Sequence, residues 1–211
     1  MDPADPRHFL VSGDCPADDR NCLGETTDSG QTWNVRPIPG PRCCNNAPKI
    51  TRGPAFTVYA FATNQLLKST DWGRTWSSNE FKITGYSVSS LAVGRKYLYA
   101  SVFPANSSNQ KTPVFRSPVE KISWQQVGDV HELMRGEITS IWTHPDLPNI
   151  VFIGGSMGLI ISRNAGVTWM PFAQKGLPMD KGISDLFILP GSRLRLLGTF
   201  SSGVLSFTGN R

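Results

Sequence analysis

The stretch Ser69-Thr-Asp-Trp-Gly-Arg-Thr-Trp76 decides the fold of this 211-residue chain, because the same pattern recurs twice without gaps. The two other copies are Thr26-Thr-Asp-Ser-Gly-Gln-Thr-Trp33 and Ser162-Arg-Asn-Ala-Gly-Val-Thr-Trp169. A fourth stretch, Ser117-Pro-Val-Glu-Lys-Ile-Ser-Trp124, keeps only the ends of the pattern. The closing tryptophans stand at positions 33, 76, 124 and 169, so the chain repeats every 43 to 48 residues. A period of this length is typical of repeat architectures such as solenoids and propellers.

Each residue type in the motif has a physical use in a turn between two antiparallel strands. The aspartate or asparagine can accept hydrogen bonds from backbone N–H groups further along the turn, and the threonine hydroxyl can bond the same turn. The glycine can adopt a positive φ without a Cβ penalty, and the tryptophan can open the next strand and pack against it. We therefore predict structural roles for Asp28, Gly30, Trp33, Asp71, Gly73, Trp76, Asn164, Gly166 and Trp169.

The segments between the motifs have the composition of short strands. They are rich in β-branched and aromatic residues and are bounded by Gly, Pro and Asn. Four such strands in about 45 residues form the repeat of a β-propeller blade. The sequence therefore predicts an all-β propeller of about five four-stranded blades in one domain, with at most one helical turn at 130–135. The expected blade units are 1–46, 47–82, 83–130, 131–176 and 177–211.

The first and last blades are expected to be incomplete. Pro3 and Pro6 precede an apolar strand just as Pro145 and Pro148 do, which predicts that the innermost strand of the first blade is missing. The last unit has room for three strands and lacks its closing turn. One hypothesis is that the chain belongs to a larger propeller of about six to ten blades, whose remaining blades are its partners. The other is a five-bladed ring with irregular closure.

Charge and hydropathy exclude several classes of protein. The net charge is +5, but the lysines and arginines are scattered rather than gathered in a run, so we expect no nucleic-acid partner. No run of about 18 apolar residues occurs, so no membrane span is expected. The first residues lack the basic and apolar regions of a signal peptide, so none is expected within this chain; earlier removal of a signal peptide is the alternative.

All four cysteines, Cys15, Cys22, Cys43 and Cys44, lie in the first 44 residues. Their spacing does not fit a zinc site, and we expect neither a metal nor another cofactor. The vicinal pair would need two partners, which Cys15 and Cys22 can supply, but four cysteines allow three pairings. Disulfides would place the protein in an oxidising, extracellular or periplasmic compartment. Four free thiols in a cytosolic protein are the alternative.

The three motif copies resemble the Asp-box, or BNR repeat, of the sialidase-like propellers. This superfamily includes microbial sialidases, xyloglucan-cleaving glycoside hydrolases, sortilin-type receptors and photosystem II assembly factors. The resemblance covers essentially the whole chain and implies that Asp28 and Asp71 lie at blade peripheries, far from a central cleft. The Arg-Ile-Pro motif of the family precedes its first box, whereas Arg36-Pro-Ile-Pro39 follows one here. This departure argues against sialidase activity.

Two functions remain open at this level. The first is a non-catalytic propeller that binds carbohydrate or protein, with Trp72 and Trp142 as candidate stacking platforms unless they pack in the core. The second is a glycoside hydrolase, sialidase-like or xyloglucanase-like, or a fragment of one. Such an enzyme needs two carboxylates about 5–10 Å apart. The candidates are Asp146, in a loop between the first and second strands of its blade, and Asp185, on a leading strand expected to line the channel.

Overall fold

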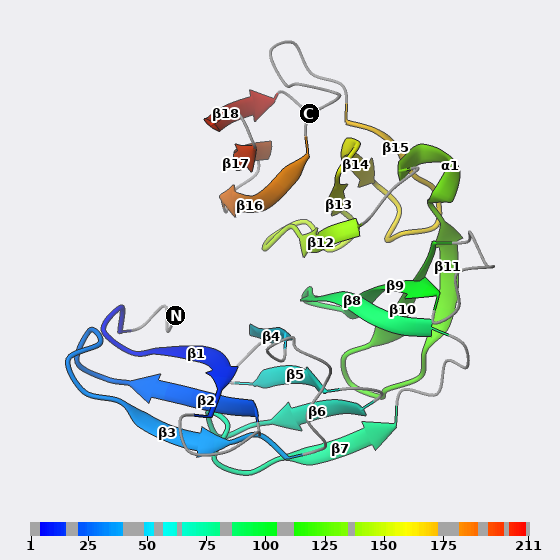
Figure 1. Cartoon of the computed structure of the whole chain (residues 1–211). Helices are drawn as coiled ribbons and strands as arrows, with labels where there is room; N and C mark the ends of the chain where they lie inside the picture. The colour runs from blue at the N-terminus through cyan, green and yellow to red at the C-terminus, as the bar shows by residue number, and fades with distance from the viewer. Residues whose placement is uncertain are drawn as a thin grey trace. The chain divides into compact units, whose positions relative to one another are not determined.

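A computed structural model gives an almost entirely β structure (Figure 1). It describes residues 5–15, 21–39, 49–52, 57–62, 65–80, 86–104, 112–134, 138–172, 182–189, 194–200 and 203–209. Within these residues the strands β1 to β18 form five antiparallel sheets, and α1 (His131–Met134) is a single helical turn. No helix in this part of the chain has the length and apolar character that a membrane crossing requires. The prediction of an all-β fold is confirmed.

The chain separates into two compact units, residues 1–82 and 83–211. The first unit contains sheet 1, with the order β1-β2-β3, and sheet 2, with the order β4-β5-β6-β7. The strands of sheet 1 are β1 (Phe9–Asp14), β2 (Asn21–Thr26) and β3 (Asn34–Pro37). The strands of sheet 2 are β4 (Lys49–Arg52), β5 (Val58–Ala62), β6 (Gln65–Ser69) and β7 (Ser77–Glu80).

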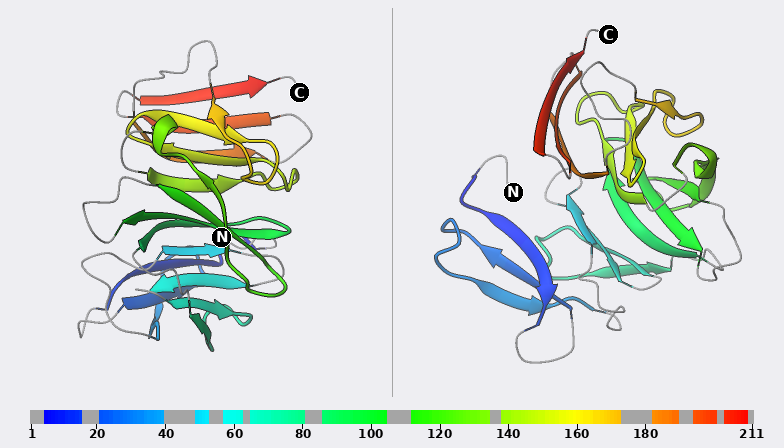
Figure 2. Two further views of the ribbon diagram at one scale, coloured as in Figure 1. Left: turned by 90° about the vertical axis from the view of Figure 1, so that its right-hand side faces the viewer. Right: turned by 45° about the horizontal axis from the view of Figure 1, so that its top comes forward.

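The second unit contains three sheets whose strands also pair in chain order. Sheet 3 consists of β8 (Tyr86–Val93), β9 (Tyr97–Pro104), β10 (Pro113–Pro118) and β11 (Gln125–Asp129). Sheet 4 consists of β12 (Ile138–Thr143), β13 (Val151–Gly155), β14 (Gly158–Ser162) and β15 (Met170–Pro171). Sheet 5 consists of β16 (Ile183–Leu189), β17 (Leu194–Phe200) and β18 (Gly203–Gly209). In Figure 2 these sheets, coloured from green to red, form successive layers.

The motif and a shared bulge identify equivalent strands in different sheets. In sheets 2 and 4 the motif joins the third strand to the fourth, and in sheet 1 it joins β2 to β3. Strands β1 to β3 therefore correspond to the second, third and fourth strands of a full sheet. The leading strands β8, β12 and β16 share an irregularity near their start, so β16 is a first strand. Within the described residues, the predicted distribution of three, four, four, four and three strands is confirmed.

The sheets of the second unit pack face to face. Successive side chains of a strand point to opposite faces, and we call the face toward the next sheet in the chain the forward face and the opposite one the rear face. Tyr99, on the forward face of sheet 3, shares a buried cluster with Ile141 and Ile153 on the rear face of sheet 4. Phe152, on the forward face of sheet 4, is buried with Leu186 on the rear face of sheet 5. Each junction thus buries one face from both of its sheets.

The first unit contains a junction of the same kind. Leu23 of sheet 1 is buried with Ala60 and Leu67 of sheet 2, and Ile38, just after β3, joins this cluster. Trp76, the last residue of the second motif, packs against the same cluster. The forward face of sheet 1 is therefore covered by sheet 2.

Hydroxyl groups link the leading strands of the second unit, which lie side by side (Figure 1). Thr143 Oγ1, on β12, donates to the backbone oxygen of Val93 on β8 at 2.8 Å. Thr139 Oγ1, also on β12, donates to the backbone oxygen of Ile183 on β16 at 2.8 Å. Leading strands of neighbouring sheets in a propeller do not form a continuous ladder, so these side chains supply bonds that the backbone alone does not make.

Candidate functional site

The three complete motifs form nearly identical hydrogen-bonded turns. In the second motif, Asp71 Oδ1 accepts the Thr75 amide at 2.8 Å, and Asp71 Oδ2 accepts the Thr75 hydroxyl at 2.6 Å. The Ser69 hydroxyl donates to Asp71 Oδ1 at 2.7 Å and accepts the Gly73 amide at 2.7 Å. The first and third motifs repeat these contacts at matching positions. The side chains of Asp28 and Asp71 thus close their turns through hydrogen bonds.

Asn164 shows how the third motif works without a charge. Its Oδ1 accepts the Thr168 amide at 2.8 Å, as the aspartate does in the other motifs. Its Nδ2 then donates to Thr168 Oγ1 at 2.8 Å, so the polarity of that bond is the reverse of the one in the aspartate motifs. A threonine hydroxyl can donate or accept, and for this reason both side chains fit the same turn.

The hydrogen bonds of the motif also set the acidity of its carboxylates. The Thr32 hydroxyl and amide, together with the Thr26 hydroxyl, lower the pKa of Asp28 to about 2. The hydroxyl and amide of Thr75 lower the pKa of Asp71 well below its usual value. An acid catalyst needs a pKa near the working pH, so these carboxylates are suited to structure and not to proton transfer.

The motif needs positive φ at two consecutive positions. The glycines have φ values of 89°, 77° and 87° at Gly30, Gly73 and Gly166. The residues before them, Ser29, Trp72 and Ala165, are also left-handed, with φ near 60°. Trp72 therefore occupies a strained turn position, and its side chain is buried against His8, with the ring centres 4.0 Å apart. It is not an exposed stacking platform. Trp142 is half-buried and packs on the core of sheets 4 and 5.

The second and third motifs are each connected to the preceding sheet by one arginine, a contact that the sequence did not predict. Arg36 Nη2, on β3, donates to the backbone oxygen of Trp72 at 3.4 Å. Arg116 Nη1, on β10, donates to the backbone oxygen of Ala165 at 2.9 Å. Trp72 and Ala165 hold the same left-handed position in the second and third motifs, so the two contacts are equivalent. The sequence gives no signal for them, because the arginines come from different strands of their sheets.

A buried carboxylate lies beside the first of these contacts. Glu25, on β2, is almost fully buried and accepts Arg36 Nη2 at 2.6 Å. His8 Nε2 lies 2.9 Å from the same carboxylate, and Arg74 Nη2 lies 3.5 Å from it. Burial by itself raises the pKa of Glu25, but the hydrogen bonds from Arg36 and His8 lower it below its usual value overall. The ionised Glu25 thus ties sheet 1 to the second motif.

Asp146, the first candidate acid, has an arginine partner. Arg95 Nη2 donates to Asp146 Oδ1 at 2.8 Å, and Arg95 Nε donates to the backbone oxygen of Pro145. The loop is ordered from inside by the buried His144, whose Nδ1 accepts the amides of Asp146 and Leu147 at 3.1 Å each. These bonds require an unprotonated Nδ1, and burial lowers the pKa of His144. The contacts hold Asp146 in a shaped turn that follows the end of β12.

Asp185, the second candidate acid, lies in a different place. It is on β16 two residues after Ile183, which contacts the start of β12, whereas Asp146 follows the end of β12. Its Oδ1 accepts the amide of its neighbour Leu186. The bulge aligns Asp185 with Ser90 of β8, whose hydroxyl accepts the Ile141 amide of the next sheet. The register therefore places Asp185 on the forward face of sheet 5, whereas Asp146 lies in the turn that follows β12.

The buried tyrosines also lack the properties of a nucleophile. Tyr59 and Tyr99 are fully buried on the second strands of sheets 2 and 3. Burial raises the pKa of both hydroxyls. A tyrosine nucleophile needs the opposite shift, toward an ionised and accessible oxygen. In the described residues, no group of three or more His, Cys, Asp or Glu side chains could hold a metal ion.

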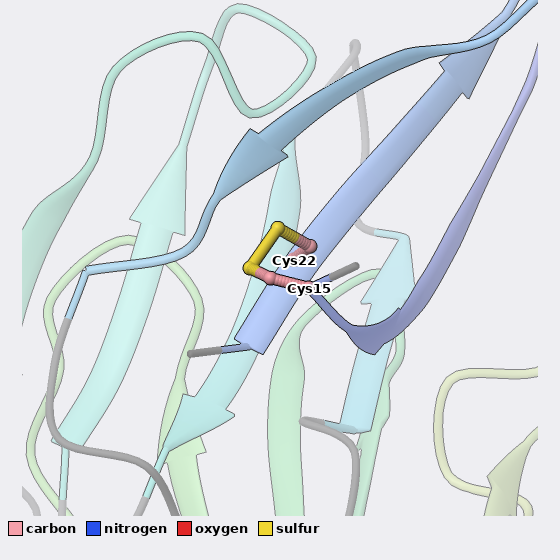
Figure 3. The surroundings of a disulfide bond; sticks show 2 residues. All are labelled: Cys15 and Cys22. Carbon is pink, nitrogen blue, oxygen red and sulfur yellow. A yellow bond between two sulfur atoms is a disulfide. The ribbon is translucent and has the colours of Figure 1, made fainter. Parts of the chain in front are cut away.

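A disulfide joins Cys15 to Cys22, with their Cα atoms 5.0 Å apart (Figure 3). It closes the loop between β1 and β2 on the rear side of sheet 1. Cys15 and Cys22 thus pair with each other and not with Cys43 and Cys44, which lie outside the described residues. The local register explains this choice, since Asp14 pairs directly with Asn21 and brings the two cysteines together at the end of the hairpin.

Among the described residues, two sheet faces each expose three large apolar side chains. On the rear face of sheet 1, Val11, Gly24 and Val35 lie opposite one another on the three strands, and Trp33 lies over Gly24. Val11, Trp33 and Val35 are each 44–49% exposed. None of these residues carries a charge. By contrast, the apolar residues at the junctions between neighbouring sheets of each unit are buried.

The forward face of sheet 5 is the second exposed face. Phe187 lies opposite Leu197, and Val204 lies opposite Thr199. Phe187, Leu197 and Val204 are 42–63% exposed. Asp185 is on the same face, next to Phe187 along the strand. Across β16, β17 and β18 this face therefore carries three large exposed apolar side chains, with Asp185, Thr199 and Ser206 between them.

Comparison with known proteins bears on this arrangement. No protein-family model matches the sequence, and no curated protein matches it. Solved structures do match it. An ancestral GH74 enzyme has a TM-score of 0.69 and 14% identity over 93% of this chain. A chain from a structure of YCF48 bound to D1 peptide has a TM-score of 0.50 and 15% identity over 97%. A chain of a nidogen–laminin complex has a TM-score of 0.56 and 9% identity over 96%.

The chain has the β-propeller fold of these proteins. At these identities the likeness shows the fold alone. The chain spans 31% of the length of the GH74 enzyme, 75% of the YCF48 chain and 77% of the chain from the nidogen–laminin complex. A shared propeller fold hosts unrelated functions, so activity has to be argued from the side chains.

Proposed function

We propose that this chain is a non-catalytic binding propeller whose partner is a protein. The observation that carries the proposal is the exposed apolar forward face of sheet 5, formed by Phe187, Leu197 and Val204. Several large apolar side chains exposed together on one sheet face are typical of an interaction site. Its side chains are held by a paired sheet, so the surface is shaped before a partner arrives.

The positions of the side chains that would serve glycan hydrolysis or sugar binding also favour a protein partner. Asp146 is held by Arg95, Asp185 lies on the apolar face, and Glu25 is buried among arginines. Trp72, a candidate sugar platform, is buried. A protein partner agrees better with these positions than a glycan substrate does. One neighbour by fold, YCF48, was solved with a peptide bound.

We place this function in an extracellular or periplasmic compartment. The Cys15–Cys22 disulfide supports that location, because disulfides persist in oxidising compartments. Mass spectrometry with and without a reductant measures the pairing of Cys15 with Cys22 in the protein isolated from such a compartment. We expect this pairing to be complete.

A glycoside hydrolase is the second candidate, favoured by the fold likeness to a GH74 enzyme. It predicts turnover of xyloglucan or of sialylated oligosaccharides by the parent chain. That turnover would be lost in Asp146→Ala or Asp185→Ala. Turnover with this dependence would overturn the binding proposal, and we expect none.

The binding function is tested with a library of phage-displayed linear peptides selected on the parent chain. Phe187→Asp places a charge on the apolar face, opposite Leu197 of the central strand. Met157→Asp is the matched control, because Met157 is similarly exposed but lies in the turn between β13 and β14. We expect the selected peptides to bind the parent and the control alike and to bind Phe187→Asp at least about tenfold more weakly. Peptides that bind all three proteins equally would contradict the proposal.

A further inference from the structure

The junctions within each unit follow one rule. The forward face of a sheet receives the rear face of the next sheet. Where that next sheet carries a complete motif, as sheets 2 and 4 do, the motif's tryptophan packs there as well. Trp76 of sheet 2 packs on the Leu23 cluster of sheet 1. Trp169 of sheet 4 packs against sheet 3, where a Cβ on Gly128 would lie 2.8 Å from Trp169 Nε1. A rear face therefore presents an indole, and a forward face receives it.

The two exposed apolar faces are one of each kind. The rear face of sheet 1 presents Trp33 between Val11 and Val35, and it carries no charged residue at these positions. The forward face of sheet 5 presents Val204 on its third strand, as sheet 1 presents Leu23, and Phe187 on its leading strand. Trp33 is exposed because no described sheet of its unit lies behind it. Its counterparts Trp76 and Trp169 are partly covered.

We infer that the forward face of sheet 5 in one molecule binds the rear face of sheet 1 in a second copy of this chain. This inference rests on the proposed function and names its partner. The forward faces of sheets 1, 3 and 4 are each covered by a repeat sheet of this chain, so a repeat sheet is the expected partner of the forward face of sheet 5. Each copy of the chain carries both complementary faces, so a second copy can supply that sheet. The contact is heterologous, so association proceeds head to tail and leaves one face of each kind free at the ends.

Heterologous binding makes a prediction that a symmetric dimer does not. Phe187→Asp places a charge on the forward face of sheet 5 and leaves the rear face of sheet 1 unchanged. Val35→Asp places a charge on the rear face of sheet 1 and leaves the forward face of sheet 5 unchanged. Each variant alone should stay monomeric, because burying an unpaired charge in an apolar interface is strongly unfavourable. An equimolar mixture of the two should form a dimer, because one intact pair of faces remains.

Sedimentation velocity over a range of concentrations tests this for the parent, each variant and the mixture. We expect the parent and the control Met157→Asp to associate with increasing concentration. The self-association of each face variant should be at least about tenfold weaker, and the mixture should stop at two chains. Circular dichroism and thermal melting of each variant establish that it is folded.

Three results would overturn the inference. A parent that is monomeric at all concentrations would mean that the faces do not meet between copies. Val35→Asp dimers formed without a partner variant would indicate a symmetric contact through sheet 5. A mixture that stays monomeric while the parent associates would place the contact elsewhere. In each case, peptide selection on sheet 5 still tests the proposed function independently.

Discussion

Replacing Gly73 by alanine tests how the second motif packs on sheet 1. Gly73 has a φ of 77°, and an added Cβ would meet Leu23 Cδ2 and would lie 3.1 Å from Trp76 Cζ2. Leu23 is 1% exposed and is packed by Ile38 and Leu67, so it has no room to turn away. The substitution therefore combines backbone strain with overpacking of the junction between sheets 1 and 2.

Gly30→Ala is the matched control, because the first motif has the same backbone with more space. Gly30 has a φ of 89°, and its added Cβ would lie 3.6 Å from Trp33 and 3.7 Å from Phe9, which is ordinary contact. A left-handed alanine costs about 1–2 kcal/mol, and overpacking a core costs about 1–3 kcal/mol. We expect Gly30→Ala to lose about 1–2 kcal/mol of unfolding free energy. Gly73→Ala should lose about 2–5 kcal/mol.

The assay is urea unfolding followed by circular dichroism, with both variants and the parent measured under the same conditions. The informative quantity is the difference between the two alanine variants, since the backbone term is common to both. A difference of about 1–3 kcal/mol is expected from the overpacking alone. Equal losses would refute the reasoning, because they would mean that Gly73 does not face a packed neighbour.

Three further outcomes follow from the side-chain contacts. Asp71→Asn should be tolerated far better than Asp71→Ala in the same urea assay, because Asn164 already serves this position in the third motif; equal losses for the two variants would contradict this. His144 has a lowered pKa, so its contribution to stability is complete above about pH 6.5 and is lost as the pH falls through the folded-state pKa. Melting temperatures are measured for the parent and His144→Gln as the pH falls below about 6.5. An equally steep fall for both proteins would contradict a stabilising role of the neutral His144. Replacing Cys15 and Cys22 by serine should lower stability by about 2–3 kcal/mol through loop entropy, and an unchanged urea midpoint would argue that the bond is absent.

Much of the fold was predictable from spacing alone. The recurrence of Asp71, Gly73 and Trp76 at fixed intervals identifies a turn that needs a hydrogen-bond acceptor, a positive φ and an apolar anchor. These requirements are local, involving residues within eight positions of one another, so a sequence pattern can express them. Alternating apolar runs between the turns then give the strands and their order. The distribution of strands among the five sheets follows from the same reasoning.

The candidate site was less predictable, because it depends on which face each residue reaches. Asp185 stands on a leading strand, and its identity alone does not reveal that a bulge turns it to the forward face of sheet 5. Trp72 stands at a turn position, where an exposed side chain would be expected. Its backbone is left-handed, and its indole packs against the His8 ring. In the sequence, Arg36 is notable only because Arg36-Pro-Ile-Pro39 partly resembles the Arg-Ile-Pro motif. Its actual partners, Glu25 and Trp72, are 11 and 36 positions away in the chain.

The sequence by itself determined the repeat, the turn chemistry and the number of strands, because each of these depends on contacts between near neighbours in the chain. Only the tertiary structure decided that Cys15 pairs with Cys22, on which sheet face Asp185 lies and which sheet faces expose apolar side chains. Those outcomes depend on the register of strands and on the stacking of sheets, where a shift of one residue moves a side chain to the opposite face. The exposed faces of sheets 1 and 5 belong to this second group.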